Sequence, residues 1–228
     1  MELFIADLIK AFVFMKGTKM IEISAVLEAQ LHIEGMKGII FDLDDTLYGE
    51  KEYVRSGYRE IAKILPQVKD ADVKLWGLFE QKKAAIDELL KQEGIEEESL
   101  KAKCLQAYRN QIPDIHFYPG VEKMLRDLKA EGYVLGIITD GRPEGQRAKI
   151  KVLGLEEIVD HIIVTDELGG AQFRKPNTKA FELMKEKMKL EYKELCYIGD
   201  NINKDFIAPE SLGMRSIWFK NKDGLYVS

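Results

Sequence analysis

Short hydrophobic segments recur along the chain, and longer stretches with helical periodicity separate them. These segments are KGIIFDL at 37–43, YVLGIIT at 133–139, HIIVT at 161–165, LCYIG at 195–199 and MRSIWF at 214–219. Most are uniformly apolar rather than alternating, which is typical of parallel strands buried on both faces. The intervening stretches carry apolar residues at i, i+3 and i+4, as in Val121, Met124, Leu125 and Leu128. The pattern therefore predicts an α/β fold in which helices cover a parallel sheet.

A long helical insertion is predicted between the first two strands. Far more residues separate these two segments than a βα crossover requires. Residues 51–112 have helical periodicity throughout, with breaks at Pro66 and Gly94. We expect them to form a small helical bundle, inserted into a core made of residues 36–50 and 113–228.

Residues 1–35 precede the first predicted strand. They are amphipathic and mostly helical in pattern, with breaks near Gly17 and Gly35. We expect an N-terminal helical extension outside the core, packed either against the chain or against a partner. Met20 and Met36 are alternative start positions, and a chain from Met36 keeps every motif described below.

Composition narrows the class of protein. The 228 residues are 46% hydrophobic and 32% charged, as in a globular protein with a sizeable core. The chain has 34 Lys and Arg and 39 Asp and Glu, so its net charge is −5, which argues against a nucleic-acid binder. The cysteines and histidines lack the spacing of a disulfide framework or a zinc site. No apolar run reaches the length of a membrane span, and acidic residues near the N-terminus argue against a signal peptide, so we expect a cytoplasmic protein.

The first predicted strand ends in clustered carboxylates. It runs into FDLDDTLY at 41–48, and alternation along an extended backbone places Asp42 and Asp44 on the same side. They would lie beyond the carboxyl end of the sheet, where α/β folds bind ligands. A calcium loop is excluded, because it requires Gly and Glu where this chain has Leu47 and Tyr53. Capping of a following helix is the alternative, and it does not explain Asp42.

Three further strands also end in polar residues. The second is followed by Thr139-Asp140-Gly141, whose hydroxyl and backbone N–H groups suit an anion. Lys175 follows the third strand, and Asp200 and Asp205 follow the fourth, within GDNINKD. Each of these alone is ordinary loop chemistry. Taken in sequence order, the strands bring acids, a hydroxyl, an ammonium and acids again to one edge of the sheet.

This order of motifs, DxDxT, Thr-Asp-Gly, Lys-Pro and GDNxxxD, resembles the haloacid dehalogenase (HAD) superfamily of phosphotransferases. The resemblance covers roughly residues 36–228 and leaves residues 1–35 outside. It implies a Rossmann-like core, and it identifies the predicted bundle at 51–112 as a helical cap that closes over the active site.

The resemblance also implies a role for each matching residue. Asp42 matches the nucleophile that attacks phosphorus to form an aspartyl-phosphate, and Asp44 matches the acid/base that protonates the departing alcohol and then activates water. Thr139 and Lys175 match the residues that bind the transferring phosphoryl oxygens. Asp140 and Gly141 belong to the same phosphate-binding turn.

A magnesium site is implied by the same motifs. Asp200 matches a ligand of Mg²⁺, together with the carboxylate of Asp42 and the backbone carbonyl of Asp44, and Asp205 matches a second acid that supports the metal. Oxygen ligands favour Mg²⁺ over zinc, and a phosphate dianion needs a cation beside a carboxylate nucleophile. The second aspartate favours a phosphatase over a dehalogenase. Crowding of Asp44 by Asp42 and Asp45 is expected to raise its pKa.

The expected substrate is a small phosphorylated metabolite, such as a sugar phosphate or a nucleotide, with no nucleic-acid or membrane partner. Tyr48, Arg55, Arg59 and Arg142 are the candidates for contacts that select it; for the arginines, a solvated surface is the alternative. A phosphomutase and a phosphoacceptor module without turnover are the competing functions. The oligomeric state and the identity of the substrate stay open.

Overall fold

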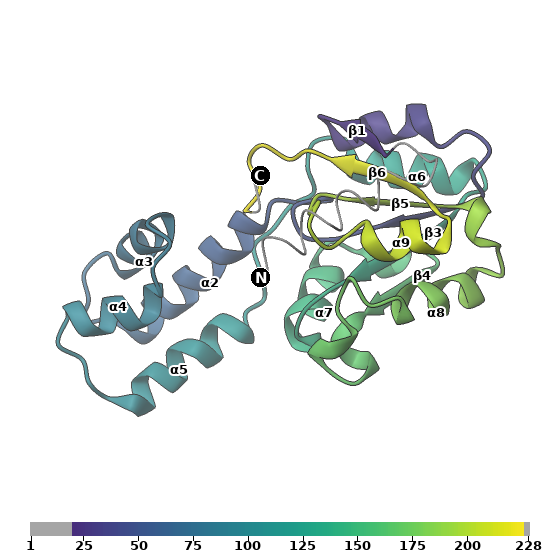
Figure 1. The fold of residues 1–228 in the computed structure, drawn as a ribbon. Helices are drawn as coiled ribbons and strands as arrows, with labels where there is room; N and C mark the ends of the chain where they lie inside the picture. The colour runs from purple at the N-terminus through teal and green to yellow at the C-terminus, as the bar shows by residue number, and fades with distance from the viewer. Residues whose placement is uncertain (1–19, 226–228) are drawn as a thin grey trace.

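A computed structural model describes residues 20–225 of the chain. Its core is one sheet in which every neighbouring pair of strands is parallel, in the order β1-β6-β5-β2-β3-β4 (Figure 1). The strands are β1 (Ile21–Ile23), β2 (Gly38–Phe41), β3 (Val134–Thr139), β4 (His161–Val164), β5 (Leu195–Gly199) and β6 (Arg215–Phe219). The predicted α/β class is confirmed, and the predicted hydrophobic segments contain β2 to β6.

Helices cover both faces of the sheet, as the uniformly apolar strands require. Ile39 and Phe41 of β2 pack on the face covered by η1, α6 and α7, whereas Ile40 between them packs on the face covered by α8 and α9. The covering elements are η1 (Val26–His32), α6 (Val121–Ala130), α7 (Pro143–Val152), α8 (Lys179–Met188) and α9 (Ile207–Leu212). Short 3₁₀ turns complete the loops: η2 (Leu155–Glu157), η3 (Thr165–Leu168), η4 (Ala171–Phe173) and η5 (Tyr192–Glu194). None of the described helices is long and apolar enough to cross a membrane.

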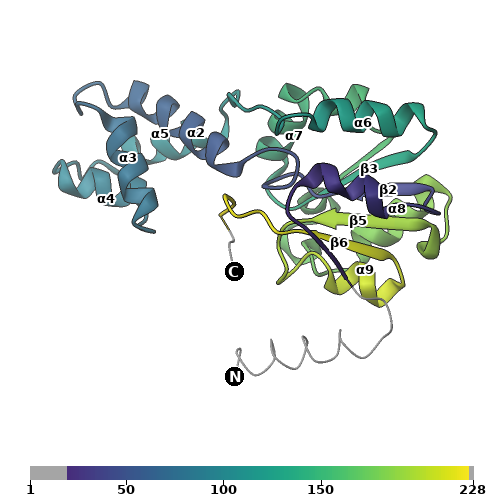
Figure 2. The same cartoon turned by 90° about the horizontal axis from the view of Figure 1, so that it is seen from above.

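A helical insertion stands to one side of the sheet, between β2 and β3 (Figures 1 and 2). It consists of α2 (Glu50–Ile64), α3 (Ala71–Glu80), α4 (Ala85–Gln92) and α5 (Glu98–Arg109). The insertion has its own buried cluster, in which Ile61, Leu75 and Leu89 are fully enclosed. Because α2 packs on both α3 and α5, this long helix holds the bundle together.

Residues 20–35 correct the expectation of a helical extension outside the core. Ile21–Ile23 form β1, which pairs in parallel with β6 at the edge of the sheet. Ile23 and Val26 are buried in the same apolar cluster as Ile39 and Phe41. The sequence pattern missed this strand because three residues are too few to show a period of two, whereas Val26–His32 do form a 3₁₀ helix. The rest of that predicted extension, residues 1–19, lies outside the described residues.

The centre of the sheet sets the place of the site. β2 lies between β3 and β5, and the chain continues from β2 to β3 and β4 on one side before it crosses to β5 and β6 on the other. In open parallel sheets, ligands bind in the crevice beyond the carboxyl ends of such strands. The polar residues that follow β2, β3, β4 and β5 all lie at this edge.

Candidate active site

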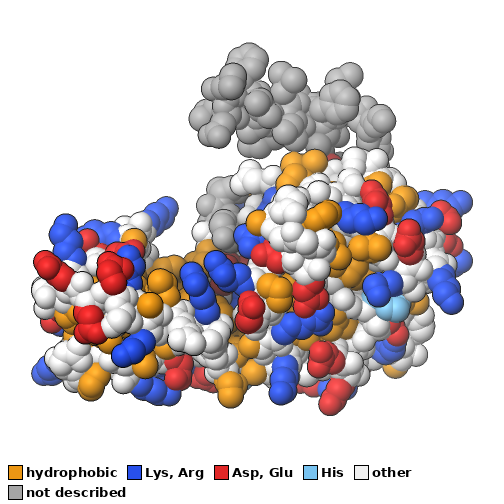
Figure 3. Space-filling view, turned by 90° about the horizontal axis from the view of Figure 1, so that it is seen from below, with side chains coloured by type: hydrophobic (Ala, Val, Ile, Leu, Met, Phe, Trp, Pro, Cys, Tyr) orange, Lys and Arg blue, Asp and Glu red, His pale blue; other side chains and the backbone are white. Residues whose placement is uncertain are grey.

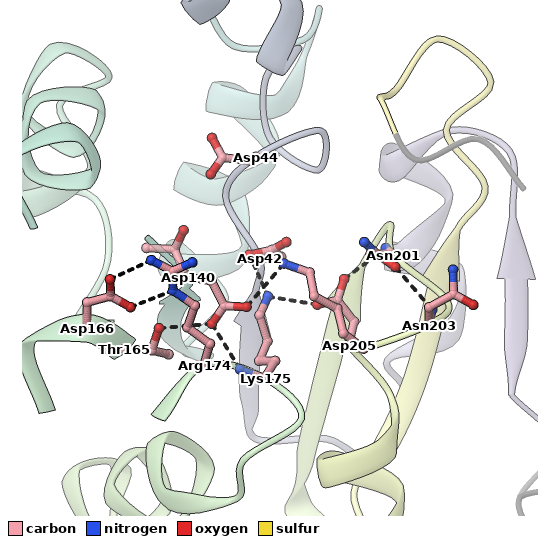
Figure 4. Close-up of polar contacts among 12 residues, drawn as sticks. Asp42, Asp44, Asp140, Thr165, Asp166, Arg174, Lys175, Asn201, Asn203 and Asp205 are labelled. Atoms are coloured by element: carbon pink, nitrogen blue, oxygen red, sulfur yellow. Dashed lines mark hydrogen bonds and ion pairs between the residues drawn. The ribbon is translucent and has the colours of Figure 1, made fainter. Parts of the chain in front are cut away.

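Lys175 joins acids that follow two neighbouring strands. Asp42 comes directly after β2, and its backbone N–H continues the sheet by donating to the Ile198 carbonyl at 2.8 Å. The buried Lys175 Nζ lies 2.8 Å from Asp42 Oδ1 and 2.7 Å from Asp205 Oδ1. The same ammonium donates a hydrogen bond of 2.8 Å to the Tyr197 hydroxyl. Figure 4 shows this ammonium between the two carboxylates.

A cluster of carboxylates lies beside Lys175. Asp42, Asp200 and Asp205 each offer an oxygen, and these oxygens lie within 4.8 Å of one another. Burial raises the pKa of Asp42 to about 7, although the Lys175 ammonium acts in the opposite direction. Burial also raises the pKa of Asp200 to about 9, and the negative charge of Asp42 adds to this rise. Acids held this close in a buried site are stabilised in their ionised form by a divalent cation. The residues therefore fit a metal ion with oxygen ligands.

The loop after β5 can approach so closely because of a glycine. A Cβ atom on Gly199 would lie 2.6 Å from Asp205 Oδ2, which is shorter than real Cβ contacts allow. The Asn201 backbone N–H donates to the same carboxylate oxygen at 2.9 Å. Gly199 therefore lets this loop fold back on itself and places Asp200 and Asp205 beside β2.

Asp44 lines the same cavity as Asp42 but has different partners, and in Figure 4 it lies apart from the row of contacts around Asp42. Lys149 Nζ lies 2.6 Å from Asp44 Oδ1, Gln146 donates to Oδ2 at 2.8 Å, and the Tyr48 hydroxyl donates to Oδ1. Burial alone would raise the pKa of Asp44, but the Lys149 ammonium and these hydrogen bonds lower it. The expected rise in the pKa of Asp44 is therefore wrong, because the Lys149 ammonium on α7 outweighs the effect of the neighbouring carboxylates.

The turn after β3 lies across from these acids. Thr139 is fully buried at the end of β3 and accepts a hydrogen bond from Gln146, which also holds Asp44. Gly141 has a φ of 137°, in the region that favours glycine, and a Cβ there would lie 3.3 Å from the Gln146 side chain. The turn therefore leaves room for Gln146 to contact both Thr139 and Asp44.

Both carboxylate oxygens of Asp140 have partners within the protein. Its Oδ1 accepts hydrogen bonds from the Thr165 hydroxyl at 2.9 Å and from the Lys175 backbone N–H at 3.1 Å. Lys204 Nζ lies 3.1 Å from Oδ2. Burial would raise the pKa of Asp140, and the charges of Lys175 and Lys204 lower it instead. The Asp140 carboxylate thus fixes the loops after β4 and β5 in place.

Two cavities meet at this edge of the sheet. A cavity of about 350 Å³ lies over Asp42, Lys175 and Asp200. A second one, of about 480 Å³, lies between the helical insertion and the start of α7. The space-filling view in Figure 3 shows the insertion as a separate lobe with a hollow between it and the core. A molecule with one end at Asp42 can therefore extend its other end beneath the insertion.

The residues considered for substrate contact lie in different places. Tyr48 is fully buried and contacts Asp44. The Arg55 guanidinium lies 3.9 Å from the centre of the Trp76 ring, inside the insertion, and Arg59 pairs with Asp114 at 2.7 Å. Arg142 lines the larger cavity, whereas neither Arg55 nor Arg59 lines either of the two cavities.

Several site residues were not found from the sequence. Lys149 and Gln146 lie in α7, Lys204 lies in the loop after β5, and Glu50 begins α2. Burial raises the pKa of Glu50 to about 8, and the charge of Asp44 adds to this effect. The available signal was the spacing of Gln146 and Lys149, which places both on the face of α7 that follows the Thr-Asp-Gly turn.

Comparisons with known proteins agree with this geometry. A family model described as haloacid dehalogenase-like hydrolase matches residues 39–219. A glyceraldehyde 3-phosphate phosphatase of Methanocaldococcus jannaschii is 31% identical over 199 residues, which are 80% of this chain and 84% of that protein. The crystal structure of a HAD phosphatase from Thermococcus onnurineus matches with a TM-score of 0.52 and 25% identity, over 82% of this chain and 87% of that one. A magnesium-bound HAD hydrolase from Bacillus subtilis has the same fold, with a TM-score of 0.58 and 21% identity over 80% of this chain and 86% of that one.

Proposed function

Because the chain belongs to the haloacid dehalogenase-like hydrolase family, we propose that it is a Mg²⁺-dependent phosphatase that forms an aspartyl-phosphate on Asp42. The substrate is a small phosphomonoester, and the relatives named as glyceraldehyde 3-phosphate phosphatases make that compound the first to test. The observation that carries the proposal is the position of Lys175, whose ammonium bridges Asp42 and Asp205 beside Asp200. This arrangement supplies a nucleophile, a phosphate-binding cation and ligands for a metal ion in one cavity.

In the first half-reaction, an Asp42 carboxylate oxygen attacks phosphorus, and the bond from phosphorus to the leaving oxygen breaks. Asp44, in its protonated form, gives its proton to the leaving alcohol. Lys175 binds the phosphoryl oxygens through the transfer, and the fully buried Thr139 hydroxyl joins it once Gln146 moves aside. Mg²⁺, held by Asp42, Asp200 and the Asp44 carbonyl with Asp205 in support, would offset the negative charge of the phosphoryl group.

In the second half-reaction, water attacks the phosphorus of the aspartyl-phosphate. Ionised Asp44 takes a proton from that water, and the Asp42 carboxylate and inorganic phosphate are regenerated. The pKa of Asp44 is lowered in the structure, so its carboxylate must take up a proton before the first half-reaction and is left ionised, as this base, once the alcohol has departed. The helical insertion acts as a cap, because the larger cavity for the leaving group lies between it and the core.

The test is phosphate release from a panel of phosphomonoesters, with and without Mg²⁺. We expect metal-dependent release with glyceraldehyde 3-phosphate among the substrates, and its complete loss in Asp42→Asn. Asp127→Asn is the matched control, because Asp127 pairs with Lys123 on the surface of α6 and lines neither cavity. Release of phosphate also separates hydrolysis from a phosphomutase, which returns the phosphoryl group to its substrate. Equal release by Asp42→Asn and the unaltered protein would contradict the proposal.

A further inference from the structure

Glu50 occupies the point where the two cavities meet. It is the first residue of α2, at the passage from the core into the helical insertion. Among the described residues, Glu50, Asp44 and Asp140 are the ones that line both the cavity over Asp42 and the larger cavity. A molecule whose phosphoryl group lies at Asp42 must pass these three carboxyl groups to reach the larger cavity.

Glu50 differs from the other two acids in having no partner. The oxygens of Asp44 are taken by Lys149, Tyr48 and Gln146, and those of Asp140 by protein groups on two loops. Within residues 20–225, the carboxyl group of Glu50 makes neither a hydrogen bond nor an ion pair with a side chain. Glu50 is partly exposed to the two cavities that it lines, so its carboxyl oxygens are open to hydrogen bonding by a ligand there.

We propose that Glu50 selects the leaving group by binding one of its hydroxyl groups. The substrates would then be phosphorylated polyols or hydroxyaldehydes, in which a hydroxyl group lies a few bonds from the phosphoryl oxygen. This inference rests on the proposed function, since the leaving group lies beside Glu50 only when the phosphoryl group lies at Asp42.

The chemistry of a carboxyl group fits such a ligand. A carboxyl accepts a hydrogen bond from a hydroxyl in either protonation state. The charged groups around Glu50 are Asp44 and Asp45 after β2, Lys149 on α7 and Lys204 after β5. Burial and Asp44 favour the protonated form of Glu50, which can also donate to an aldehyde oxygen.

A leaving group that carries a carboxylate fits less well. It would bring a further negative charge into the larger cavity, which Asp44 and Asp140 already line. Lys149, the buried cation there, is already paired with Asp44. The arginines that line the larger cavity, Arg109 and Arg142, are exposed to solvent, which weakens their attraction for an anion. We therefore expect phosphorylated hydroxy acids to be poor substrates.

The experiment compares two substrates, with and without hydroxyl groups, in two proteins, with and without the Glu50 side chain. The values of kcat/KM are measured with glycerol 3-phosphate and with n-propyl phosphate, which lacks both hydroxyls, for the unaltered protein and for Glu50→Ala. We expect a preference for glycerol 3-phosphate of about tenfold or more in the unaltered protein, falling to near unity in Glu50→Ala. Glu50→Gln keeps an acceptor oxygen and should keep most of the preference.

Controls separate this inference from the proposed function. Glu144→Ala removes an exposed acid from the wall of the same cavity and should leave the preference unchanged. p-Nitrophenyl phosphate reports intact chemistry and folding in each variant. If the unaltered protein hydrolyses no phosphomonoester with Mg²⁺, the proposed function fails and takes this inference with it.

Two outcomes would overturn the role of Glu50 alone. One is a preference for glycerol 3-phosphate that stays the same in Glu50→Ala while p-nitrophenyl phosphate is still hydrolysed. The other is hydrolysis of 3-phosphoglycerate by the unaltered protein at least as fast as that of glycerol 3-phosphate. At least tenfold slower hydrolysis of 3-phosphoglycerate supports the inference.

Discussion

Lys149 Nζ lies 2.6 Å from Asp44 Oδ1, and its side chain is only 4% exposed. The pair joins helix α7 to the loop after β2, and the ring of Tyr53, from the helical insertion, lies 4.2 Å from the same ammonium. Breaking a buried ion pair leaves an uncompensated charge, so each partner fixes the position of the other. Lys149 is therefore a positioning residue for Asp44, the proposed acid/base.

Replacing Lys149 by Met should affect substrates according to their leaving group. Asp44 must protonate the oxygen of an alkyl leaving group, whereas p-nitrophenolate departs without a proton. We expect kcat/KM for glycerol 3-phosphate to fall by roughly 100-fold and kcat/KM for p-nitrophenyl phosphate by less than tenfold. Steady-state kinetics on both substrates measures this difference.

Two further variants guard this prediction against a general loss of structure. Lys149→Arg keeps the charge and should recover part of the activity on glycerol 3-phosphate. Lys151→Met removes an exposed lysine from the same helix and should leave both substrates unaffected. An equal loss on both substrates in Lys149→Met would show that Lys149 has only a structural role.

The sequence predicted the parts of the site that depend on strand ends. Buried parallel strands are recognisable as apolar runs, and the residues that follow them must meet at one edge of the sheet. Asp42, Lys175 and Asp205 were singled out on this basis, and the structure brings them into direct contact. Their order along the chain also carried the resemblance to the family, which the comparisons confirm.

The parts that the sequence did not predict depend on how helices face the site. Lys149 and Gln146 resemble the polar face of a solvated helix, and only the packing of α7 against Asp44 shows that they are buried. Arg55 and Arg59 share a helix face, but that face packs on Trp76 and pairs with Asp114. Side-chain periodicity gives the face that residues share, not the surface that this face meets.

Without a metal ion, the protein should lose stability as the pH rises. Asp42 and Asp200 have pKa values of about 7 and about 9, well above the value of about 3.9 in an unfolded chain. Between these limits the folded state binds more protons than the unfolded state, so the free energy of unfolding falls with increasing pH. We expect the Tm in EDTA to decrease by roughly 5 °C or more from pH 5 to pH 9.

Added Mg²⁺ should reverse this loss, because it binds the ionised carboxylates and only in the folded protein. The increase in Tm on adding Mg²⁺ should therefore be larger at pH 9 than at pH 5. Asp200→Asn is the control: it removes one of these acids and should weaken both the pH dependence and the effect of Mg²⁺. Thermal denaturation that is equally sensitive to pH in Asp200→Asn would contradict this account.

The arginines near the insertion should differ in their effect on substrate binding. Arg142 lines the larger cavity, whereas Arg55 stacks on Trp76 and Arg59 pairs with Asp114. We expect Arg142→Ala to raise KM severalfold, and Arg59→Ala to leave KM within about twofold because exposed ion pairs contribute little. Arg55→Ala should lower the stability of the insertion by about 0.5–1 kcal/mol without a change in KM. A larger rise of KM in Arg59→Ala than in Arg142→Ala would show that the insertion presents a different face to the substrate.

Residues 20–35 should be required for a stable core, although every catalytic motif follows Met36. They supply the edge strand that pairs with β6, and the Arg215 guanidinium donates hydrogen bonds to the His32 and Glu34 carbonyls at 2.8 and 2.9 Å.

Burial of Ile23, together with the apolar face of η1, contributes about 5 kcal/mol, a large fraction of the stability of a typical domain. A chain that starts at Met36 should therefore aggregate through the exposed edge of β6 or unfold at a much lower denaturant concentration than a chain that starts at Met20. Ile23→Ala in the full chain provides a milder test, with an expected loss of about 2–4 kcal/mol in urea denaturation. Equal denaturation midpoints for the two truncated chains would show that the strand at 21–23 adds nothing to the fold.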